Sequence, residues 1–296
     1  GHASGLGAAQ IVQRSVTVTG GLGALGRLVG VWSVESGTSH LKLLGRSGRG
    51  GELGVLESVV GGMRGRARVS VGRADTACSG ECGHTTQDVG CVGPAGEIVM
   101  HAGGVLQDAT LGNQCARGMR EVVAPKLGGA RQLERGWWAA PGEGSVLFSS
   151  VAALLGSGGQ ANYVAANSGL DAVAEAAAAC GLGGRVVSVQ WGGWGGGGMA
   201  SGAQIARMER LGVGMLEPAQ GLAALEAAGG AGAGAAVVTA NPFAWETFLG
   251  RLPAVPGLFG EFGETRAAVA EPSAARRVRP ARRGALRSTA TRRAAV

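Results

Sequence analysis

Seven short runs of apolar and β-branched residues, separated by segments long enough for helices, constrain the fold of this 296-residue chain most strongly. The runs are continuous rather than alternating, which is typical of strands that are buried on both faces of a sheet. Strands that alternate with helices predict a parallel sheet covered on both sides, that is, a doubly wound, Rossmann-type α/β fold. The expected strands are Ser15–Thr19, His40–Leu44, Arg68–Gly72, Glu97–His101, Ser145–Ser149, Val186–Trp191 and Ala236–Ala240.

Charge is spread unevenly along the chain. Residues 264–296 contain nine arginines and two glutamates, which together account for the whole net charge of +7. This segment has no apolar period and no aromatic residues between its arginines, so we expect a linker or disordered tail rather than a nucleic-acid-binding arm. We therefore divide the chain into an N-terminal remnant or linker (1–14), one folded domain (15–263) and the tail (264–296).

Cysteine usage and hydropathy indicate a soluble, cytoplasmic protein. Five cysteines are an odd number, which favours reduced thiols in a reducing compartment. We find no signal segment and no apolar run of about 18 residues, so no membrane partner is expected. The chain begins with glycine rather than methionine, which suggests an excerpt of a longer protein or a processed product. Three cysteines and a histidine lie close together in the sequence, at Cys78, Cys82, His84 and Cys91. Their spacing lacks the paired CxxC of structural zinc sites, so we expect no metal there.

A glycine-rich turn follows the first expected strand and precedes a helix-length segment. Gly21, Gly23 and Gly26 form the pattern GxGxxG. Glycines at these positions allow a tight turn and let the backbone at a helix N-terminus approach the pyrophosphate of a dinucleotide. The strand–turn–helix context favours this interpretation over a chance match in a glycine-rich chain. The expected cofactor contacts of the turn are Thr19, Gly20, Gly21, Leu22, Gly23, Leu25 and Gly26.

The end of the second expected strand indicates which dinucleotide binds. An NAD site carries Asp or Glu about 20 residues after the glycines, to accept hydrogen bonds from the ribose. This chain has Arg46 and Ser47 there instead. A guanidinium can bind a 2′-phosphate through two hydrogen bonds, so we predict NADPH, although a solvated loop arginine is the alternative. Further contacts, expected because ligands lie beyond the carboxyl ends of parallel strands, are Asp75 at the adenine and Ala102, Gly103 and Gly104 at the nicotinamide half.

Four polar side chains are candidates for catalysis. Ser150 ends the fifth expected strand, and Tyr163, the only tyrosine, opens an alanine-rich helix that runs to about Cys180. Asn167 lies one helical turn after Tyr163, on the same face. Lys126 lies on the helix before the fifth strand, where Pro125 removes one helical hydrogen bond. Taken singly, Ser150 is equally explained as a helix cap, Asn167 as a surface amide and Lys126 as a solvated charge.

As a set, these motifs resemble the catalytic half of a ketoreductase from a modular polyketide synthase, a member of the short-chain dehydrogenase/reductase superfamily, and less closely the fatty-acid synthase counterpart. The resemblance runs in family order from about Val16 to Ala200 and continues more weakly to about Phe262. The matching stretches are TVTGGLGALG, LLGRSGR, VMHAGGVLQDATL, VVAPKLGGARQL, SVLFSSVAALLGSGGQANYVAANSGLDAVA and VQWGGWGGGGMA.

The resemblance implies NADPH-dependent reduction of a β-ketoacyl thioester that an acyl carrier protein delivers from a neighbouring synthase domain. It implies that Tyr163 protonates the ketone oxygen, that Ser150 hydrogen-bonds this oxygen, and that Lys126 binds the ribose and lowers the tyrosine pKa. Asn167 would hold a water of the proton relay. Lysine and asparagine are exchanged in sequence relative to many other short-chain dehydrogenases, as in synthase ketoreductases.

The resemblance also implies residues that act on the substrate and set the stereochemistry. Leu106-Gln107-Asp108 resembles the Leu-Asp-Asp motif of domains that form the D-hydroxy product, with the middle aspartate replaced. The tryptophan that marks the opposite class would fall at Leu155 and is absent. These two positions favour the D-hydroxy product. The residues expected on the substrate side are Asp108, Leu155, Trp191 and Met199.

Two alternatives remain open from the sequence. The first alternative is a free-standing short-chain reductase of a small ketone or acyl-CoA, although the exchanged lysine and asparagine count against this. The second alternative is a non-catalytic scaffold domain of the same fold. Such domains typically lose the tyrosine or the glycine turn, whereas both are present here.

Overall fold

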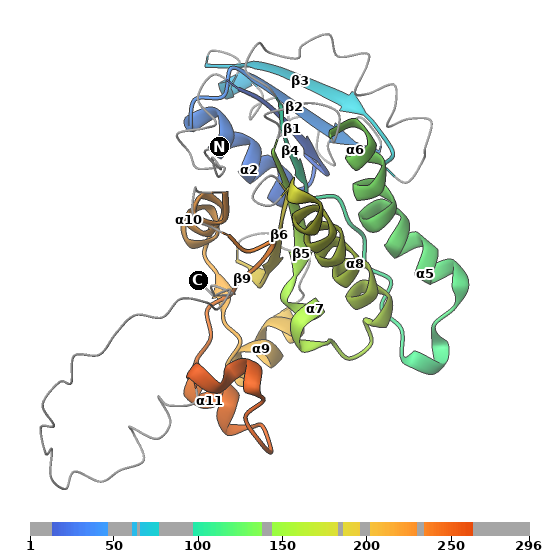
Figure 1. Ribbon diagram of the computed structural model, residues 1–296, viewed down its shortest axis with the longest axis vertical. Coiled ribbons are helices and arrows are strands. Elements are labelled where there is room, and N and C mark those ends of the chain that lie inside the picture. The colour runs from blue at the N-terminus through green and yellow to red at the C-terminus, as the bar shows by residue number, and fades with distance from the viewer. Residues whose placement is uncertain are drawn as a thin grey trace, which may run out of the picture.

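The computed structural model describes residues 14–46, 61–63, 66–76, 97–137, 144–182, 186–195, 202–229 and 234–262. Within these ranges, seven strands form one parallel sheet in the order β3-β2-β1-β4-β5-β6-β9 (Figure 1). This architecture confirms the predicted doubly wound α/β fold. The strands are β1 (Ser15–Thr19), β2 (His40–Gly45), β3 (Arg68–Arg73), β4 (Glu97–His101), β5 (Gly144–Ser150), β6 (Val186–Trp191) and β9 (Val237–Ala240).

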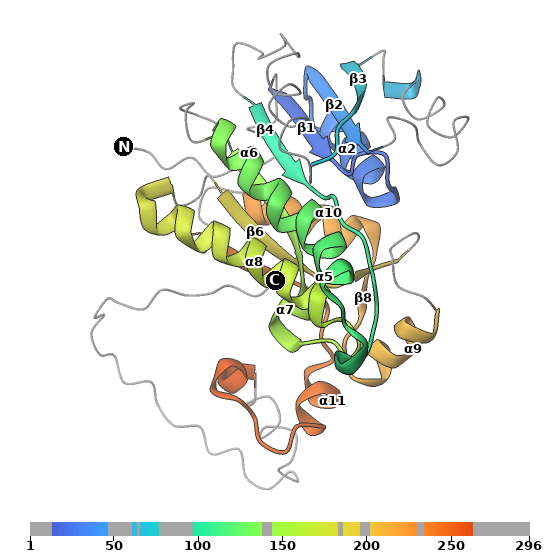
Figure 2. The ribbon, with the colours of Figure 1, turned by 90° about the vertical axis from the view of Figure 1, so that its right-hand side faces the viewer.

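Helices cover both faces of the sheet. On one face lie α2 (Ala24–Glu35) and α10 (Pro218–Gly229), and on the other lie α5 (Ala116–Val123), α6 (Gly129–Trp137) and α8 (Ala161–Ala177) (Figures 1 and 2). The strand order reverses between β1 and β4, so the connections leave on opposite faces there. This reversal opens a crevice at the carboxyl ends of the strands, where α/β proteins bind ligands.

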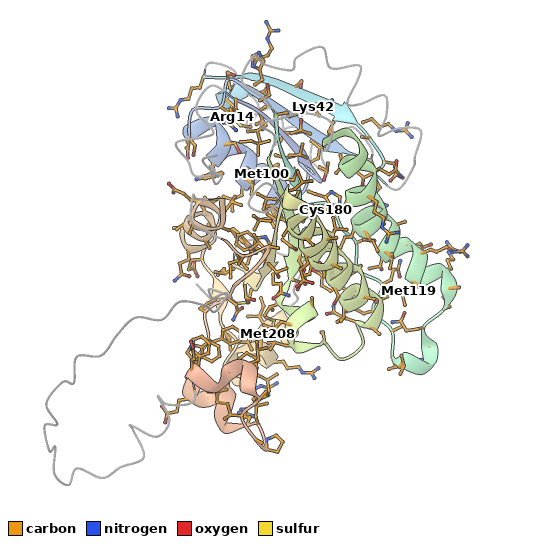
Figure 3. All side chains as sticks on the ribbon, in the orientation of Figure 1. Arg14, Lys42, Met100, Met119, Cys180 and Met208 are labelled. Carbon is orange, nitrogen blue, oxygen red and sulfur yellow. The ribbon has the colours of Figure 1, made fainter. Side chains whose placement is uncertain are left out.

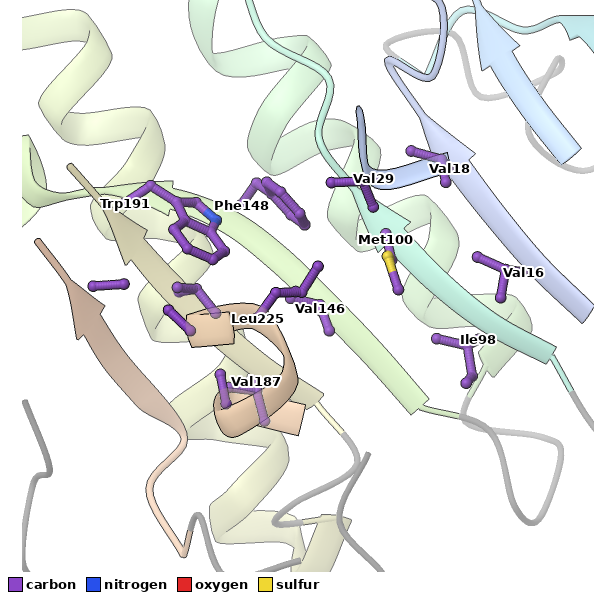
Figure 4. Packing of buried hydrophobic residues seen from close by; sticks show 14 of the residues in the cluster. Val16, Val18, Val29, Ile98, Met100, Val146, Phe148, Val187, Trp191 and Leu225 are labelled. Atoms are coloured by element: carbon purple, nitrogen blue, oxygen red, sulfur yellow. The ribbon is translucent and has the colours of Figure 1, made fainter. Parts of the chain in front are cut away.

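The two hydrophobic cores reflect these two helix layers. The larger core packs residues of the central strands, including Val18, Met100 and Phe148, against Val29 of α2 and Leu225 of α10 (Figure 4). The smaller core, on the opposite face, includes residues of β4, β5, α6 and α8. Its central members are Val99, Leu133, Leu147, Leu170 and Ala174. The apolar runs were thus correctly interpreted as strands that contribute side chains to both faces.

Two details of the strand and helix predictions need correction. The third strand is not buried on both faces, because β3 is the edge of the sheet and Arg68, Val71 and Arg73 are exposed. The alanine-rich helix begins at Ala161, two residues before Tyr163. After Ala177 it continues as a π-helical segment, Ala178–Leu182, which contains Gly181 at φ 81°. The positive φ explains why this glycine ends the helix, since side chains disfavour that conformation.

Smaller elements gather at the carboxyl end of the sheet. They are the helix α7 (Val151–Leu155), the two-stranded parallel pair β7 (Gly193–Trp194) and β8 (Met215–Leu216), and the helices α9 (Gly202–Arg210) and α11 (Trp245–Gly250). Short 3₁₀ turns lie at Leu111–Asn113 and Gly257–Phe259. No helix among the described residues is both long and apolar enough to cross a membrane.

Several predicted features lie outside the described residues. They are the segment 264–296, most of the segment 1–14, the cofactor contact Ser47, the substrate-side residue Met199 and the cluster Cys78, Cys82, His84 and Cys91. Among the residues that are described, no three His, Cys, Asp or Glu side chains come together in a way that could hold a metal ion.

Candidate active site

A cleft of about 1460 Å³ lies at the carboxyl ends of the strands. It extends from the glycine turn after β1, past Lys126 and Tyr163, to Met208 of α9 and Phe248 of α11. Figure 3 shows Met208 at the end of the molecule where α9 and α11 lie. The volume exceeds the range of about 300–1,000 Å³ that is typical of small-molecule pockets, so the cleft has room for a dinucleotide and a second ligand.

The glycine turn has the close backbone packing that a dinucleotide site requires. Gly20 has φ 67°, and a Cβ there would lie 2.7 Å from the backbone of Gly103 at the end of β4. A Cβ on Gly26 would lie 2.3 Å from the carbonyl oxygen of Gly20. Gly23 is the N-cap of α2 and provides no side-chain acceptor to the first helical turn, which also contains no acidic residue. The turn therefore leaves N–H groups for an anion and fits the pyrophosphate of a dinucleotide.

The other expected cofactor contacts are distributed along the same cleft. Leu22, Leu25, Arg46 and Ala102 line it, as do Gly103 and Gly104. The side chain of Thr19 is buried and directed to His101 instead, and Gly21 packs under the turn with its N–H donated to Leu44. After β3, the lining residues are Ala74 and Thr76, whereas Asp75 between them is not part of the lining.

The electrostatic character of the cleft is cationic. The basic residues that line it are Arg46, Lys126, Arg207 and Arg251, and no Asp or Glu is among the lining residues of the described chain. Arg46 lies after β2, beside the glycine turn, while Arg207 and Arg251 lie at the far end. Fixed positive charge in a cleft attracts anionic ligands, and a phosphorylated dinucleotide fits this lining.

Lys126 occupies an unusual stretch of helix. Residues Ala124–Gly128 form a π-helical turn between α5 and α6, with Pro125 inside it, so the expected local disruption by proline is present. Lys126 is buried, and its ammonium donates a hydrogen bond of 2.8 Å to the carbonyl oxygen of Phe148 in β5. Burial lowers the pKa of Lys126 to about 8, and the negative charge of Asp171 acts in the opposite direction. The interpretation of Lys126 as a solvated charge is thereby excluded.

Ser150 and Tyr163 lie next to Lys126. Ser150 caps α7, since its Oγ accepts a hydrogen bond from the N–H of Ala152 at 3.2 Å, so the helix-cap interpretation is correct as well. The Lys126 Nζ lies 5.5 Å from the centre of the Tyr163 ring. Burial raises the pKa of Tyr163, and the polar side chains of Ser150 and Asn167 nearby lower it only in part. The net direction is opposite to the lowering by Lys126 that the family resemblance implied.

Asn167 is a buried residue and not a surface amide. Its Nδ2 donates a hydrogen bond of 2.8 Å to the carbonyl oxygen of Tyr163, one turn earlier in α8. Its Oδ1 is buried and has no hydrogen-bond partner among the described residues. A buried carbonyl oxygen without a partner is costly, and one water bound there would satisfy it.

The residues expected on the substrate side have different environments. Asp108 is exposed and accepts hydrogen bonds from Gln160, just before α8, at 3.1 and 3.2 Å. Leu155, at the end of α7, lines the cleft. The ring of Trp191 belongs largely to the core, where its centroid lies 5.4 Å from that of Phe148 (Figure 4). Trp191 also lines the cleft, so it is both a packing residue and part of the cleft wall, and sequence reasoning alone did not show the packing role.

Sequence reasoning missed two polar residues beside the site. Thr76 lines the cleft and donates a hydrogen bond of 3.2 Å to the carbonyl oxygen of Pro125. His101 is fully buried and contacts both Thr19 and the backbone of Lys126. The only signal for His101 was a polar residue that follows the apolar run Ile98–Met100 at the end of the strand, directly before Ala102 and Gly103.

Comparisons with known proteins agree with this geometry. A family model described as the KR domain matches residues 15–196. Polyketide synthase GfsB of Streptomyces halstedii is 35% identical over 251 residues, which is 82% of this chain and 4% of that protein. The chain thus spans only a small part of this synthase.

Solved structures give the same result. The first ketoreductase of the tylosin polyketide synthase superposes with a TM-score of 0.75 at 30% identity, over 89% of this chain and 56% of that one. A structure described as an A-type ketoreductase from a modular polyketide synthase gives a TM-score of 0.73 at 30% identity, over 82% of this chain and 51% of that one. About half of each matched structure therefore has its counterpart in this chain.

Proposed function

Since the chain belongs to the KR domain family, the ketoreductases of polyketide synthases, we propose that it uses NADPH to reduce a β-ketoacyl thioester, carried by an acyl carrier protein, to the β-hydroxyacyl thioester. We further propose that residues 15–263 are the catalytic domain, that 1–14 are an N-terminal remnant or linker, and that 264–296 are an Arg/Ala-rich linker or disordered tail. We also propose that the protein works in the cytoplasm beside other synthase domains. The observation that carries the proposal is the meeting of Lys126, Ser150, Tyr163 and Asn167 in one cleft or directly behind it, next to the glycine turn.

The residues of the cleft would divide the work between cofactor and substrate. NADPH, when bound, supplies a hydride to the ketone carbon. The N–H groups of the glycine turn would hold its pyrophosphate, and Arg46 would bind the 2′-phosphate through two hydrogen bonds. Ala102, Gly103 and Gly104 have little or no side chain, so they leave room for the nicotinamide half against the backbone.

The proton would come from Tyr163. Its hydroxyl donates a proton to the ketone oxygen as the C=O bond becomes C–O–H, while Ser150 donates a hydrogen bond to the same oxygen. The Tyr163 anion that remains would be stabilised by the Lys126 ammonium, and the proton would be replaced through a water held at Asn167 Oδ1. Because burial raises the pKa of Tyr163, this hydroxyl stays protonated and able to donate at neutral pH.

The product configuration is also a proposal. Asp108 is present and Leu155 stands where the tryptophan of the opposite class would fall, so we propose the D-hydroxy product. Overall likeness to a structure described as A-type does not decide this, because the fold is common to the family and only residues beside the ketone select the face that is reduced.

The test is single-turnover reduction of a β-ketoacyl thioester by the wild-type chain and by Tyr163→Phe, with NADPH compared with NADH. Removal of a positioned general acid is expected to lower the rate by about 10²–10⁴-fold. Equal rates for the two proteins would remove Tyr163 from the mechanism, and no reduction by the wild type would overturn the proposed function.

The cofactor assignment has its own matched pair. Arg46→Ala is expected to weaken NADPH use selectively, because the 2′-phosphate is absent from NADH. Arg68→Ala, an exposed arginine at the opposite end of the neighbouring strand β3, is the control and should leave the preference unchanged. An unchanged preference in Arg46→Ala would contradict the assignment.

A further inference from the structure

His101 is a buried titratable residue to which the mechanism above gives no role. It ends β4, opposite Thr19 of β1 in the sheet register, and it is fully buried. Its Nδ1 lies 2.7 Å from the Thr19 hydroxyl, and its Nε2 lies 2.9 Å from the carbonyl oxygen of Lys126. The imidazole therefore joins the strand that leads into the glycine turn to the segment that carries the lysine.

Hydrogen-bond chemistry fixes the state of this ring. A carbonyl oxygen can only accept, so Nε2 carries the hydrogen and donates it to Lys126. In the neutral imidazole, Nδ1 is then an acceptor and the Thr19 hydroxyl donates to it. Burial lowers the pKa of His101 to about 4, so the ring keeps this one tautomer at neutral pH.

The backbone that His101 holds is a place where ordinary helical bonding is interrupted. In the π-helical turn Ala124–Gly128, the N–H of Gly129 is shared between the carbonyl oxygens of Ala124 and Lys126. The preceding carbonyl, of Pro125, accepts a hydrogen bond from Thr76. Thr76, which follows β3, and His101, which ends β4, thus bind the carbonyl oxygens of two successive residues of this turn.

Close packing leaves the turn little freedom. A Cβ on Gly129 would lie 2.8 Å from His101 Cε1 and 2.9 Å from Thr76 Cβ, so the absence of a side chain there lets the helix approach both groups. A Cβ on Gly104 would lie 2.8 Å from Lys126 Cε. With the Lys126 ammonium bound to Phe148, both ends of the lysine residue are fixed, the backbone by His101 and the side chain by β5.

We propose that His101 is a positioning residue for the reduction, which sets the place of the Lys126 ammonium beside Tyr163 through the hydrogen bond from its Nε2–H to the Lys126 carbonyl. This inference rests on the proposed function, in which Lys126 acts on the ribose and on Tyr163. The competing explanation is that His101 only joins β1 to β4 through Thr19, as the hydrogen bond between Thr17 and Glu97 joins the same two strands elsewhere.

Two substitutions separate these explanations. In His101→Gln, the amide nitrogen can reach the position of Nε2 and keep the bond to Lys126. In His101→Asn, the shorter side chain can still accept from Thr19 but cannot reach the Lys126 carbonyl. Loss of the hydrogen bond that orients a metal ligand lowers activity by about 10–100-fold, and we expect a supporting bond to a catalytic lysine to act on the same scale. The kcat should therefore fall by about that factor in His101→Asn and stay within the wild-type order of magnitude in His101→Gln.

Thr17→Val is the control for a purely structural effect. It removes a hydrogen bond between β1 and β4 without touching the cleft, so it should lower the melting temperature but leave kcat unchanged. Equal kcat in His101→Asn and His101→Gln would overturn the positioning role. A fall in kcat in Thr17→Val as large as in His101→Asn would do the same.

A second measurement does not depend on activity. The chain has two lysines, Lys42 and Lys126, so the side-chain NMR signals of ¹⁵N-labelled lysine report Lys126 directly. The Lys126 titration midpoint should move in His101→Asn and stay in place in His101→Gln, with Lys42 unaffected in both. A Lys126 midpoint that is the same in all three proteins would refute the proposal. A wild-type chain without reductase activity would instead overturn the proposed function, and the lysine titration would still test His101.

Discussion

Replacing Lys126 with methionine measures what the burial of its ammonium costs the fold. Methionine has a similar length and no charge. The Lys126 side chain is buried, and its pKa falls from 10.5 to about 8, chiefly because the charged form loses its hydration. The same shift places the ionisation of this proposed catalytic residue close to physiological pH.

The sign and size of the effect follow from linkage between protonation and folding. Because the folded state binds the Lys126 proton more weakly than the unfolded state does, the free energy of unfolding rises with pH between about 8 and 10.5. Below about pH 8, the shift corresponds to a destabilisation of about 3 kcal/mol. Wild type should therefore gain about 2–3 kcal/mol relative to Lys126→Met between pH 7 and pH 10.

Urea unfolding of both proteins at a series of pH values from 7 to 10 measures this difference. Groups whose pKa values are the same in the two proteins do not contribute to the pH dependence of the difference in unfolding free energy. Any part of the lost hydrogen bond to Phe148 that is independent of pH shifts this difference by a constant and does not change its slope. A difference in unfolding free energy that stays flat across the series would refute the reasoning. It would mean that water or a counter-charge compensates the ammonium in the folded protein.

Three further predictions follow from the same contacts. Asp171→Asn removes the charge that raises the Lys126 pKa, so the Lys126 midpoint should fall below its wild-type value in the lysine NMR titration; a rise would contradict the assigned cause. Gly129→Ala would place a Cβ 2.8 Å from His101 Cε1 and should destabilise the protein by about 1–3 kcal/mol in urea unfolding, whereas an unchanged midpoint would show that the turn relaxes freely. Tyr163 is the only tyrosine, and because burial raises its pKa above 10.0, the phenolate absorbance should appear at higher pH in the folded protein than in urea; coincident titrations would disprove the burial effect.

The order of strands and helices could be predicted from the sequence because its signals are local. The run Ser15–Thr19 is a strand with the same bounds in the structure, as are Glu97–His101 and Val186–Trp191. The sequence signal of the glycine turn is also local, because the tight bend and the positive φ of Gly20 depend on the identity of a few adjacent residues. Edge position is not local, and for that reason the exposure of β3 was missed.

The set of candidate catalytic residues came from motifs in their order along the chain, and the fold brings Lys126, Ser150, Tyr163 and Asn167 together. Their chemical states did not follow from those motifs. Lowering of the Lys126 pKa depends on the layers that exclude water from it, which come from distant parts of the sequence.

Sequence by itself determined that this chain forms a doubly wound sheet with a glycine turn and a family-type set of polar residues, because period, turn chemistry and motif order depend on neighbouring residues. Only the tertiary structure decided that Trp191 packs in the core, that Tyr163 has a raised pKa and that His101 holds the backbone of Lys126. The first two properties arise from packing and desolvation, and the third from hydrogen bonds of His101 to residues 82 and 25 positions away in the sequence. Such contacts are set only when the layers pack.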